Sequence, residues 1–303
     1  MARDWESDFS KWTERASDRE ERRYEWMRDA IRDALRASGT LSSYSFVVYA
    51  KGSYPNFTNV VRDSDVDIAA ELTELYKADF IGDVEGENLQ SLGHSLYTGT
   101  YDLPEFKNDV EQALIDGFGS SAIERGKKAI HVRERQQGLA ADVVPCVTHR
   151  TFTSRAHYWQ GIRLRNDAPP WEEIDNYPAQ HKERGTAKND RTNRRYKRVV
   201  RILKRLENEM VKKDVIAEVP SFLIESAVYN VPDGHFTSPV NWTGRVRNAL
   251  AHIFNGTMSA DCVRSSDWME VNNIKYLFHP AQGWTYQQAH GFASEAWDYI
   301  GFD

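Results

Sequence analysis

Three aspartates, Asp63, Asp65 and Asp67, lie within five positions of one another at the start of an apolar run, inside the segment AKGSYPNFTNVVRDSDVDIAAEL (50–72). Residues two apart on a β-strand point to the same side, so a strand over DVDIAAEL places Asp65 and Asp67 together and Val66 and Ile68 on the other side. The two carboxylates are about 7 Å apart along such a strand and can share divalent cations. Mg²⁺ prefers hard oxygen ligands and binds substrate phosphates. We interpret Asp63, which lies outside this strand, as a turn residue.

Other polar residues extend this candidate site. Asp142, in AADVVPC, has apolar neighbours on a second expected strand, where a charge needs a partner or a metal. If that strand lies beside the first, Asp142 joins the same site. Gly52 and Ser53 follow a third expected strand, YSFVVYA (44–50), and a glycine lets backbone N–H groups approach a phosphate to which the serine hydroxyl also donates. Together these residues provide the metal ligands and phosphate contacts that two-metal phosphoryl transfer requires.

Composition and charge exclude several classes of protein. The chain has 303 residues, of which 40% are hydrophobic, enough for one large domain or two intimate lobes. A net charge of −6 excludes a generally basic protein, so any polyanion must bind locally. The two cysteines, Cys146 and Cys262, form no metal-type cluster, as in a reduced cytoplasmic protein. No apolar run approaches the roughly 20 residues of a membrane span, and the polar N-terminus is not a signal peptide.

The periodic patterns predict a helix, then a mixed α/β core, then a helical lobe. Helices are expected over 4–37 with a joint near Ser17, over 104–119, from 192 onward, and over 220–229, 239–254 (with Ser238 as cap) and 285–299. Strands are expected over 44–50, 65–72, 129–134 and 139–145, with a hairpin turn at Gln137-Gly138. Residues 80–103 and 166–192 are interpreted as a surface excursion and a loop.

The spaced motifs resemble those of the polymerase-β-like nucleotidyltransferases. The helix before the core, LAADVVPC, NRRYKRVVRILKRL and VPSFLIESAVYNVP resemble more narrowly the cGAS/DncV-like nucleotidyltransferases of bacterial anti-phage defence, over roughly residues 5–300. This resemblance implies an α+β fold with a polymerase-β-like core of mixed sheet and helices. It implies an N-terminal helical segment that packs across both lobes (1–38), a catalytic core (39–150) and a C-terminal helical lobe (151–303).

The same resemblance implies an activity and its site residues. Asp65, Asp67 and Asp142 would form a triad that binds two Mg²⁺ or Mn²⁺ ions, with Gly52 and Ser53 as phosphate contacts. Family members join nucleoside triphosphates (NTPs) into cyclic di- or trinucleotides, which activate a separate effector. Regulatory or conjugating defence proteins would be further partners, and no membrane partner is expected.

A basic stripe on the helix after residue 192 has two interpretations. Arg194, Lys197, Arg201 and either Lys204 or Arg205 recur at steps of three to four residues. The stripe is either a solvated helix face or a surface that binds phosphates. The resemblance points to a lysine of this helix that contacts the donor triphosphate, and our candidates are Lys204 and then Lys197.

Other functions use the same residues. The carboxylates also serve transfer of one nucleotide to a protein, a small molecule or an RNA end, and a nucleotide-binding sensor without turnover is the non-enzymatic alternative. The basic segment HKERGTAKNDRTNRRYKR suggests nucleic-acid binding, but the sequence lacks the zinc-binding His/Cys cluster of the DNA-sensing animal relatives, so activation by nucleic acid is not predicted. His131, His149 and His157 are scattered and are interpreted as structural or surface residues.

Overall fold

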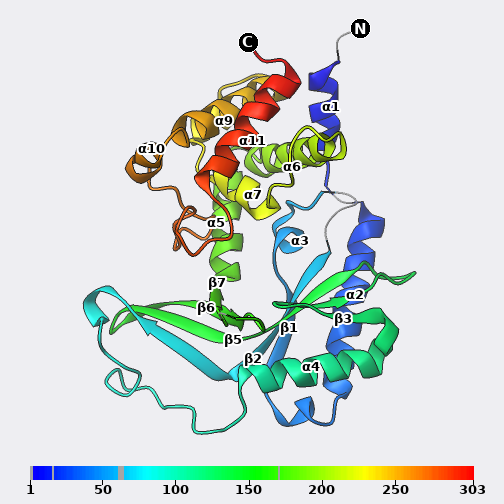
Figure 1. Cartoon of the computed structure of the whole chain (residues 1–303), viewed down its shortest axis with the longest axis vertical. Helices are drawn as coiled ribbons and strands as arrows, with labels where there is room; N and C mark the ends of the chain where they lie inside the picture. Colours follow the sequence, from blue (N-terminus) through cyan, green and yellow to red (C-terminus); the bar gives the residue numbers. More distant parts are fainter. Residues whose placement is uncertain (1–2, 16, 61–64, 170) are drawn as a thin grey trace. The chain divides into compact units, whose positions relative to one another are not determined.

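The computed structural model describes residues 3–15, 17–60, 65–169 and 171–303, which divide into two compact units (Figure 1). The sheet unit comprises Ser17–Pro55 and Ser64–Pro178, and the helical unit comprises Met1–Ala16, Asn56–Asp63 and Ala179–Asp303. The chain therefore enters the helical unit briefly between the Gly-Ser pair and the Asp-x-Asp motif.

Over its described residues, the sheet unit contains a seven-stranded mixed sheet. Its strands are β1 (Phe46–Ala50), β2 (Val66–Phe80), β3 (Ile123–Arg125), β4 (Ile130–Val132), β5 (Ala141–Ser154), β6 (His157–Arg165) and β7 (Glu173–Asn176). The order is β1-β2-β5-β4-β3, and β6 pairs with both β5 and β7. Strands β2 and β5 are parallel, and all the other pairs are antiparallel. The predicted domain boundary after residue 150 falls inside β5, because the hairpin β5–β6 and strand β7 continue the same sheet.

Helices α2 (Asp18–Ala37) and α4 (Leu103–Phe118) cover one face of this sheet (Figure 1). Val143 and Val147 of β5 belong to the apolar core that both helices share. The alternate residues Val144 and Cys146 belong to a separate small cluster with β6. Because successive side chains of a strand point to opposite faces, Asp142 lies on the face away from α2 and α4.

Most predicted elements of the first half are present. The predicted joint at Ser17 is confirmed: its hydroxyl caps α2 by accepting from the backbone N–H of Glu20, and α1 (Trp5–Trp12) packs in the helical unit. The predicted helix over 104–119 is α4, which starts with a capping box between Asp102 and Glu105. Short turns complete the unit: η1 (Leu41–Ser43), α3 (Ser53–Asn56), η2 (Gly82–Val84) and η3 (Ser120–Ala122). Between β2 and α4, the only regular element of the described chain is η2, which agrees with the surface excursion predicted for this segment.

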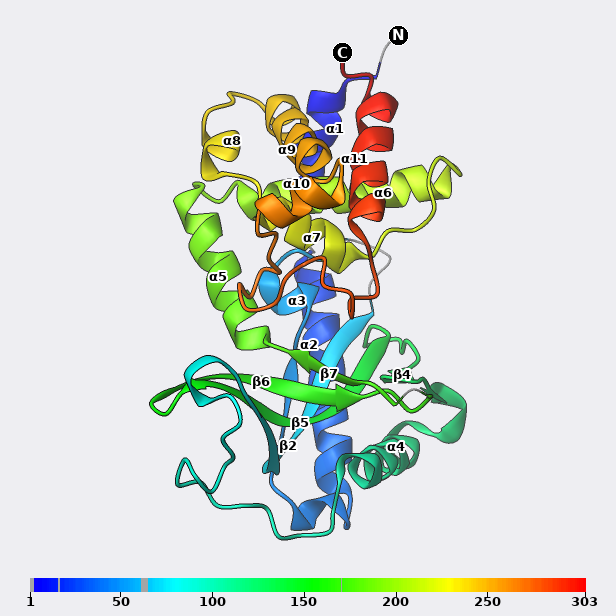
Figure 2. The same ribbon diagram turned by 60° about the vertical axis from the view of Figure 1, so that its left-hand side comes forward.

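Over its described residues, the helical unit contains α1 and seven further helices (Figure 2). They are α5 (Pro178–Arg191), α6 (Tyr196–Lys212), α7 (Ser221–Tyr229), α8 (Asp233–Thr237), α9 (Trp242–Gly256), α10 (Ala260–Ser265) and α11 (Tyr286–Ile300). All of these except α5 contribute residues to one apolar core. Helix α6 is buried on most of its sides, including Tyr196, Leu203 and Met210. Among the described residues, no helix has the length and apolar character needed to cross a lipid bilayer.

Two predictions for this half were wrong. The expected loop over 166–192 contains β7 and α5. The buried residues of α5 are His181, Gly185 and Lys188. They recur with a helical period, but none of them is a large apolar residue, so the hydrophobic pattern does not predict this helix. Helix α9 begins at Trp242, three residues later than expected, because the side chain of Asn241 provides its cap and Ser238 instead ends α8.

Candidate active site

One row of side chains crosses neighbouring strands on the face of the sheet opposite α2 and α4. In the parallel pair β2–β5, Asp67 lies directly opposite Asp142. In the antiparallel pair β4–β5, His131 lies opposite Asp142 on its other side. Lys51, just after β1, donates its backbone N–H to the carbonyl of Asp67 at 2.9 Å. Asp65 immediately precedes β2. The structure thus brings together the three predicted carboxylates and adds one imidazole and one ammonium.

The charges of this row are only partly balanced. The Nδ1 atom of His131 lies 3.1 Å from Asp142 Oδ1 and 3.4 Å from Asp65 Oδ2, and Lys51 Nζ lies 3.6 Å from Asp67 Oδ1. Partial burial raises the pKa of Asp65, the negative charges of Asp142 and Asp67 raise it further, and His131 lowers it. Each of these carboxylates disfavours the ionisation of its neighbours. A divalent cation bound between their oxygens would offset that repulsion. These residues therefore suit metal-dependent chemistry.

Gly52 lies directly against this row. Its φ angle is +72°, and a Cβ atom at this position would lie 2.3 Å from Asp67 Oδ2, far inside van der Waals contact. Both the left-handed backbone and the lack of space require glycine. Ser53 follows as the first residue of α3. The Gly-Ser pair and the Asp-x-Asp motif are therefore parts of one site.

We expect Gly52→Ala to lower turnover by at least about 100-fold, because the new methyl group must displace the Asp67 carboxylate and small misplacements at a reacting centre cost about that much. The rate of pyrophosphate release measures this. Gly39→Ala is the matched control, since no atom lies within 4 Å of its added Cβ. A Gly52→Ala rate within threefold of the parent would contradict the placement of Gly52 at the reacting centre.

The predicted lysines have unequal surroundings within the helical unit. Lys204 is buried, and its Nζ donates to Glu225 Oε2 at 2.7 Å. Glu225 also accepts from the Thr58 hydroxyl at 2.7 Å, so the ion pair is enclosed and well hydrogen-bonded. Lys197 is also buried, but its Nζ donates to the Thr186 hydroxyl at 3.4 Å, a weak hydrogen bond, and lies 5.9 Å from the centroid of the Phe57 ring. Asp63 falls outside the described residues.

The members of the predicted basic stripe that lie on α6 do not form a solvated face, whereas Arg194 precedes the helix and is exposed. Lys197, Arg201 and Lys204 are each at most 5% exposed. The guanidinium of Arg201 donates to the backbone carbonyls of Thr13 and Phe57. Burial, with nearby arginines, lowers the pKa of Arg201 to about 9. Buried cations need a partner. Each of these side chains therefore either pairs within the protein, as Lys204 does, or is available to bind an anion.

Sequence reasoning missed His131 and Lys51. His131 was interpreted as a structural or surface residue, yet it touches two of the three carboxylates. One signal was present: Ile130 and Val132 flank His131 as apolar residues flank Asp142, so a hairpin between these strands puts the two polar side chains on one face. Strand β4 has only three residues, too few to make the alternation stand out.

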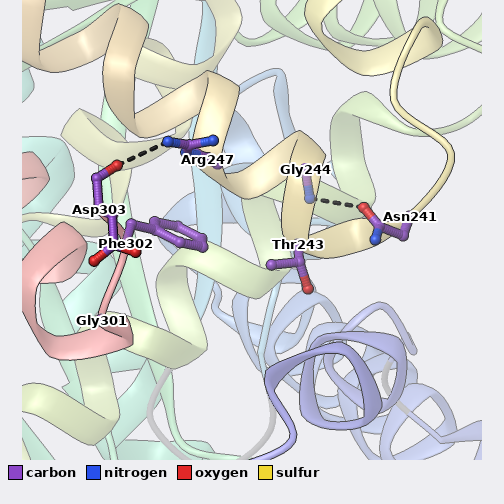
Figure 3. Close-up of a pocket in the computed structure, with 7 residues that line it drawn as sticks. All are labelled: Asn241, Thr243, Gly244, Arg247, Gly301, Phe302 and Asp303. Carbon is purple, nitrogen blue, oxygen red and sulfur yellow. Dashed lines mark hydrogen bonds between the residues drawn. The ribbon is translucent and has the colours of Figure 1, made fainter.

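Two other features do not belong to this site. A cavity of about 380 Å³ lies in the helical unit, lined by Asn241, Thr243, Gly244, Arg247, Gly301, Phe302 and Asp303 (Figure 3). All of its lining residues are in the helical unit, whereas the three carboxylates are in the sheet unit. Some of its polar groups pair with one another: Arg247 donates to the Asp303 carbonyl at 2.7 Å and the Gly244 N–H to Asn241 at 2.9 Å.

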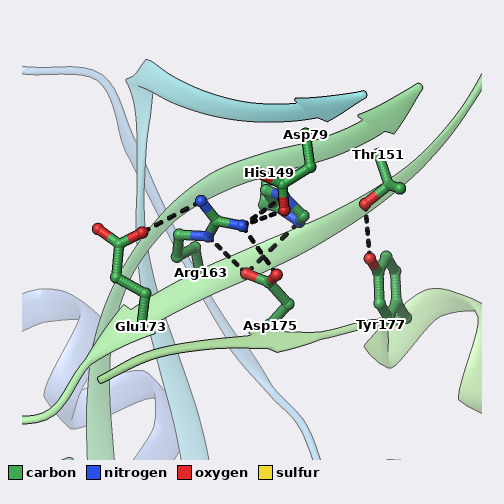
Figure 4. Close-up of polar contacts among 7 residues, drawn as sticks. All are labelled: Asp79, His149, Thr151, Arg163, Glu173, Asp175 and Tyr177. Atoms are coloured by element: carbon green, nitrogen blue, oxygen red, sulfur yellow. Dashed lines mark hydrogen bonds and ion pairs between the residues drawn. The ribbon is translucent and has the colours of Figure 1, made fainter. Parts of the chain in front are cut away.

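The second feature is a charged cluster in the sheet unit around Asp79, His149 and Asp175 (Figure 4). His149 lies seven positions after Asp142 along β5, and an odd step reverses the face, so the cluster lies on the opposite face of the sheet. Arg163 donates to Asp79, to Asp175 Oδ2 at 2.8 Å and to His149 Nε2 at 2.9 Å. The guanidinium therefore supplies the cation that these groups require, and the cluster ties β2, β5, β6 and β7 together.

Comparison with known proteins agrees with the geometry. A model of the cGAS/DncV-like nucleotidyltransferase C-terminal helical domain matches residues 183–301. A cyclic dipyrimidine nucleotide synthase, CdnE, of Legionella pneumophila is 36% identical over 99% of each chain. Another of that name, from Cecembia lonarensis, is 32% identical over 100% of each chain.

A solved structure matches equally broadly. The CdnE cyclic dinucleotide synthase of Elizabethkingia meningoseptica, with GTP and Apcpp, has a TM-score of 0.80 and 32% identity, and the match covers 98% of this chain and 99% of that one. The expected fold, a mixed sheet with helices and a helical lobe, is confirmed. A row of carboxylates beside a Gly-Ser turn, on a chain matched from end to end, places this protein in the cGAS/DncV-like nucleotidyltransferase family.

Proposed function

We propose that this nucleotidyltransferase joins NTPs into a cyclic di- or trinucleotide, with release of pyrophosphate, as a second messenger of anti-phage defence. The observation that carries the proposal is the convergence of Asp65, Asp67 and Asp142 beside Gly52. Similarity over the whole chain to relatives named cyclic nucleotide synthases supports it. The enzyme would act in the cytoplasm, where its substrates are, and its product would act on a separate effector.

The residues of the row have distinct tasks in this reaction. Asp65, Asp67 and Asp142 would hold two divalent cations, Mg²⁺ or Mn²⁺, which when bound increase the nucleophilicity of the attacking hydroxyl and stabilise the leaving pyrophosphate. The backbone N–H groups at Gly52 and the Ser53 hydroxyl would bind the triphosphate. The hydroxyl of one nucleotide attacks the α-phosphate of the next, and the bond from that phosphorus to pyrophosphate breaks. The same residues serve the second transfer, which closes the ring.

Of the two candidate lysines, we favour Lys197 as the contact to the donor triphosphate. Burial lowers the pKa of Lys197, and its hydrogen bond to Thr186 is long, whereas Lys204 already pairs with Glu225. A charge-assisted hydrogen bond contributes about 1.5–3 kcal/mol.

We therefore expect Lys197→Met to raise the KM for NTPs by roughly 10–100-fold without loss of melting temperature, because a poorly paired buried charge is removed. Steady-state kinetics and a thermal melt measure the two effects. Lys204→Met is the comparison, and it should lower the melting temperature because it breaks the pair with Glu225. An unchanged KM in Lys197→Met would contradict this assignment.

The direct test of function is the product. Purified protein is incubated with all four NTPs, α-labelled, and with Mg²⁺ or Mn²⁺, because relatives are named both as dipyrimidine and as dipurine synthases. We expect a phosphatase-resistant product whose mass equals that of a cyclic di- or trinucleotide, and none with Asp67→Asn. Linear chains alone, or label on protein or RNA, would overturn the proposal in favour of single-nucleotide transfer.

A further inference from the structure

His131 occupies a position between two of the carboxylates. Its Nδ1 atom lies 3.1 Å from Asp142 Oδ1 and 3.4 Å from Asp65 Oδ2, and one donor atom of each of the three residues falls within 4.8 Å of the others. The register of β4 against β5 fixes this position. The ring is about one-third exposed, so solvent and ions reach it.

These distances match those between neighbouring ligands of one metal ion. In an octahedral site with metal–ligand bonds of about 2.1 Å, adjacent donor atoms lie about 3 Å apart. A single N–H on Nδ1 donates fully to only one carboxylate, and the two carboxylates repel each other. A shared cation satisfies all three donor atoms at once, with neutral imidazole as the nitrogen donor.

We propose that His131 is a ligand of the ion held by Asp65 and Asp142, and that this nitrogen gives the site a preference for first-row transition-metal ions over Mg²⁺. The inference rests on the proposed metal site of this enzyme. Imidazole nitrogen binds transition metals readily, whereas Mg²⁺ takes oxygen ligands almost exclusively. A site built from carboxylates alone would lack this source of discrimination.

The alternative role for His131 is to orient Asp142 by a hydrogen bond, without touching the ion. The two roles differ in a spectroscopic property: a nitrogen ligand couples magnetically to a bound Mn²⁺ ion, and a hydrogen-bonded imidazole outside the coordination sphere does not give the same strong coupling. Pulsed electron paramagnetic resonance of the whole protein loaded with Mn²⁺ therefore separates them without any substitution.

The experiment compares the parent with three variants. His131→Gln removes the nitrogen, and His157→Gln is the matched control, because His157 lies on β6 of the same unit and hydrogen-bonds to Thr153. Asp142→Asn tests the carboxylate site itself. Each protein is titrated with Mn²⁺ while the resonance of the free ion is followed, and turnover is compared in Mn²⁺ and in Mg²⁺.

We expect a strong ¹⁴N coupling in the parent and in His157→Gln, and its loss in His131→Gln. Mn²⁺ affinity should fall by at least about tenfold in His131→Gln, and turnover should fall more in Mn²⁺ than in Mg²⁺. Mn²⁺ bound at an Asp142-dependent site without nitrogen coupling would overturn the role of His131 alone. Binding indifferent to Asp142→Asn would overturn the metal site on which that role rests.

Discussion

Replacing Asp65 with asparagine is expected to reduce cyclic nucleotide formation by at least about 10³-fold, because several kcal/mol of transition-state charge stabilisation depend on the bound metal. The same change should leave the metal-free protein as stable as the parent or more stable. The pKa of Asp65 is raised in the folded state by partial burial and by Asp142 and Asp67. A carboxylate with a raised pKa destabilises the fold when it is ionised at neutral pH, so its neutral isostere removes a repulsion.

Pyrophosphate release and thermal melts with and without Mn²⁺ and an NTP analogue measure both effects. The parent should gain melting temperature from these ligands, and Asp65→Asn should gain much less, because a ligand stabilises only the state that binds it. Asp33→Asn, at an exposed carboxylate on α2 of the same unit, is the control and should behave like the parent. A large loss of melting temperature in metal-free Asp65→Asn would mean that Asp65 is structural.

The pairing of Asp65 with Asp67 and the place of Asp142 on a buried strand were predictable because they depend on local rules. Alternation along a strand pairs Asp65 with Asp67, and the apolar residues around Asp142 mark a second buried strand. The adjacency of these strands was not local. The register that sets Asp67 opposite Asp142 depends on which strands pair, and it was inferred through family resemblance rather than from spacing.

The buried polar residues of α5 and α6 were hard to interpret from the sequence because their partners lie far along the chain. The period of α6 identifies which side chains share a face, but it does not reveal that Lys204 meets Glu225, 21 residues later. Helix α5 was missed because its buried stripe includes a histidine and a lysine, whose partners Glu225 and Asp233 again lie about 45 residues away. A hydrophobic pattern does not identify buried polar residues, although such residues connect the helices of the helical unit by hydrogen bonds.

The stability of the helical unit should depend strongly on one such residue, Glu225. Its carboxylate accepts from Lys204 Nζ at 2.7 Å, Thr58 Oγ1 at 2.7 Å and His181 Nε2 at 2.9 Å. Burial alone would raise its pKa, but the charge of Lys204 and the hydrogen bonds from His181 and Lys204 hold the pKa far below its ordinary value of 4.5. The ionised form is therefore the one that the fold stabilises.

Glu225→Gln keeps the size of the side chain and leaves the Lys204 ammonium buried without a counter-charge. Removing one partner of a buried ion pair costs about 3–5 kcal/mol, which lowers the melting temperature by roughly 6–20 °C. Because the folded pKa is depressed, this contribution is present above pH 4.5 and is lost as pH falls below it. The difference in melting temperature between the parent and Glu225→Gln should therefore be largest near pH 7 and should decrease as the pH falls below 4.5.

The double variant Glu225→Gln with Lys204→Met separates the ion pair from general packing. It removes the orphaned charge, so it should recover a large part of the stability that Glu225→Gln loses. Asp261→Asn is the surface control: its pair with Arg264 is mostly exposed, and such pairs contribute at most about 1 kcal/mol. Urea unfolding at pH 7 gives the free energies. If Glu225→Gln lost no more than this control, the Lys204 charge would have to be compensated elsewhere in the helical unit, which would return Lys204 to the candidates for phosphate binding.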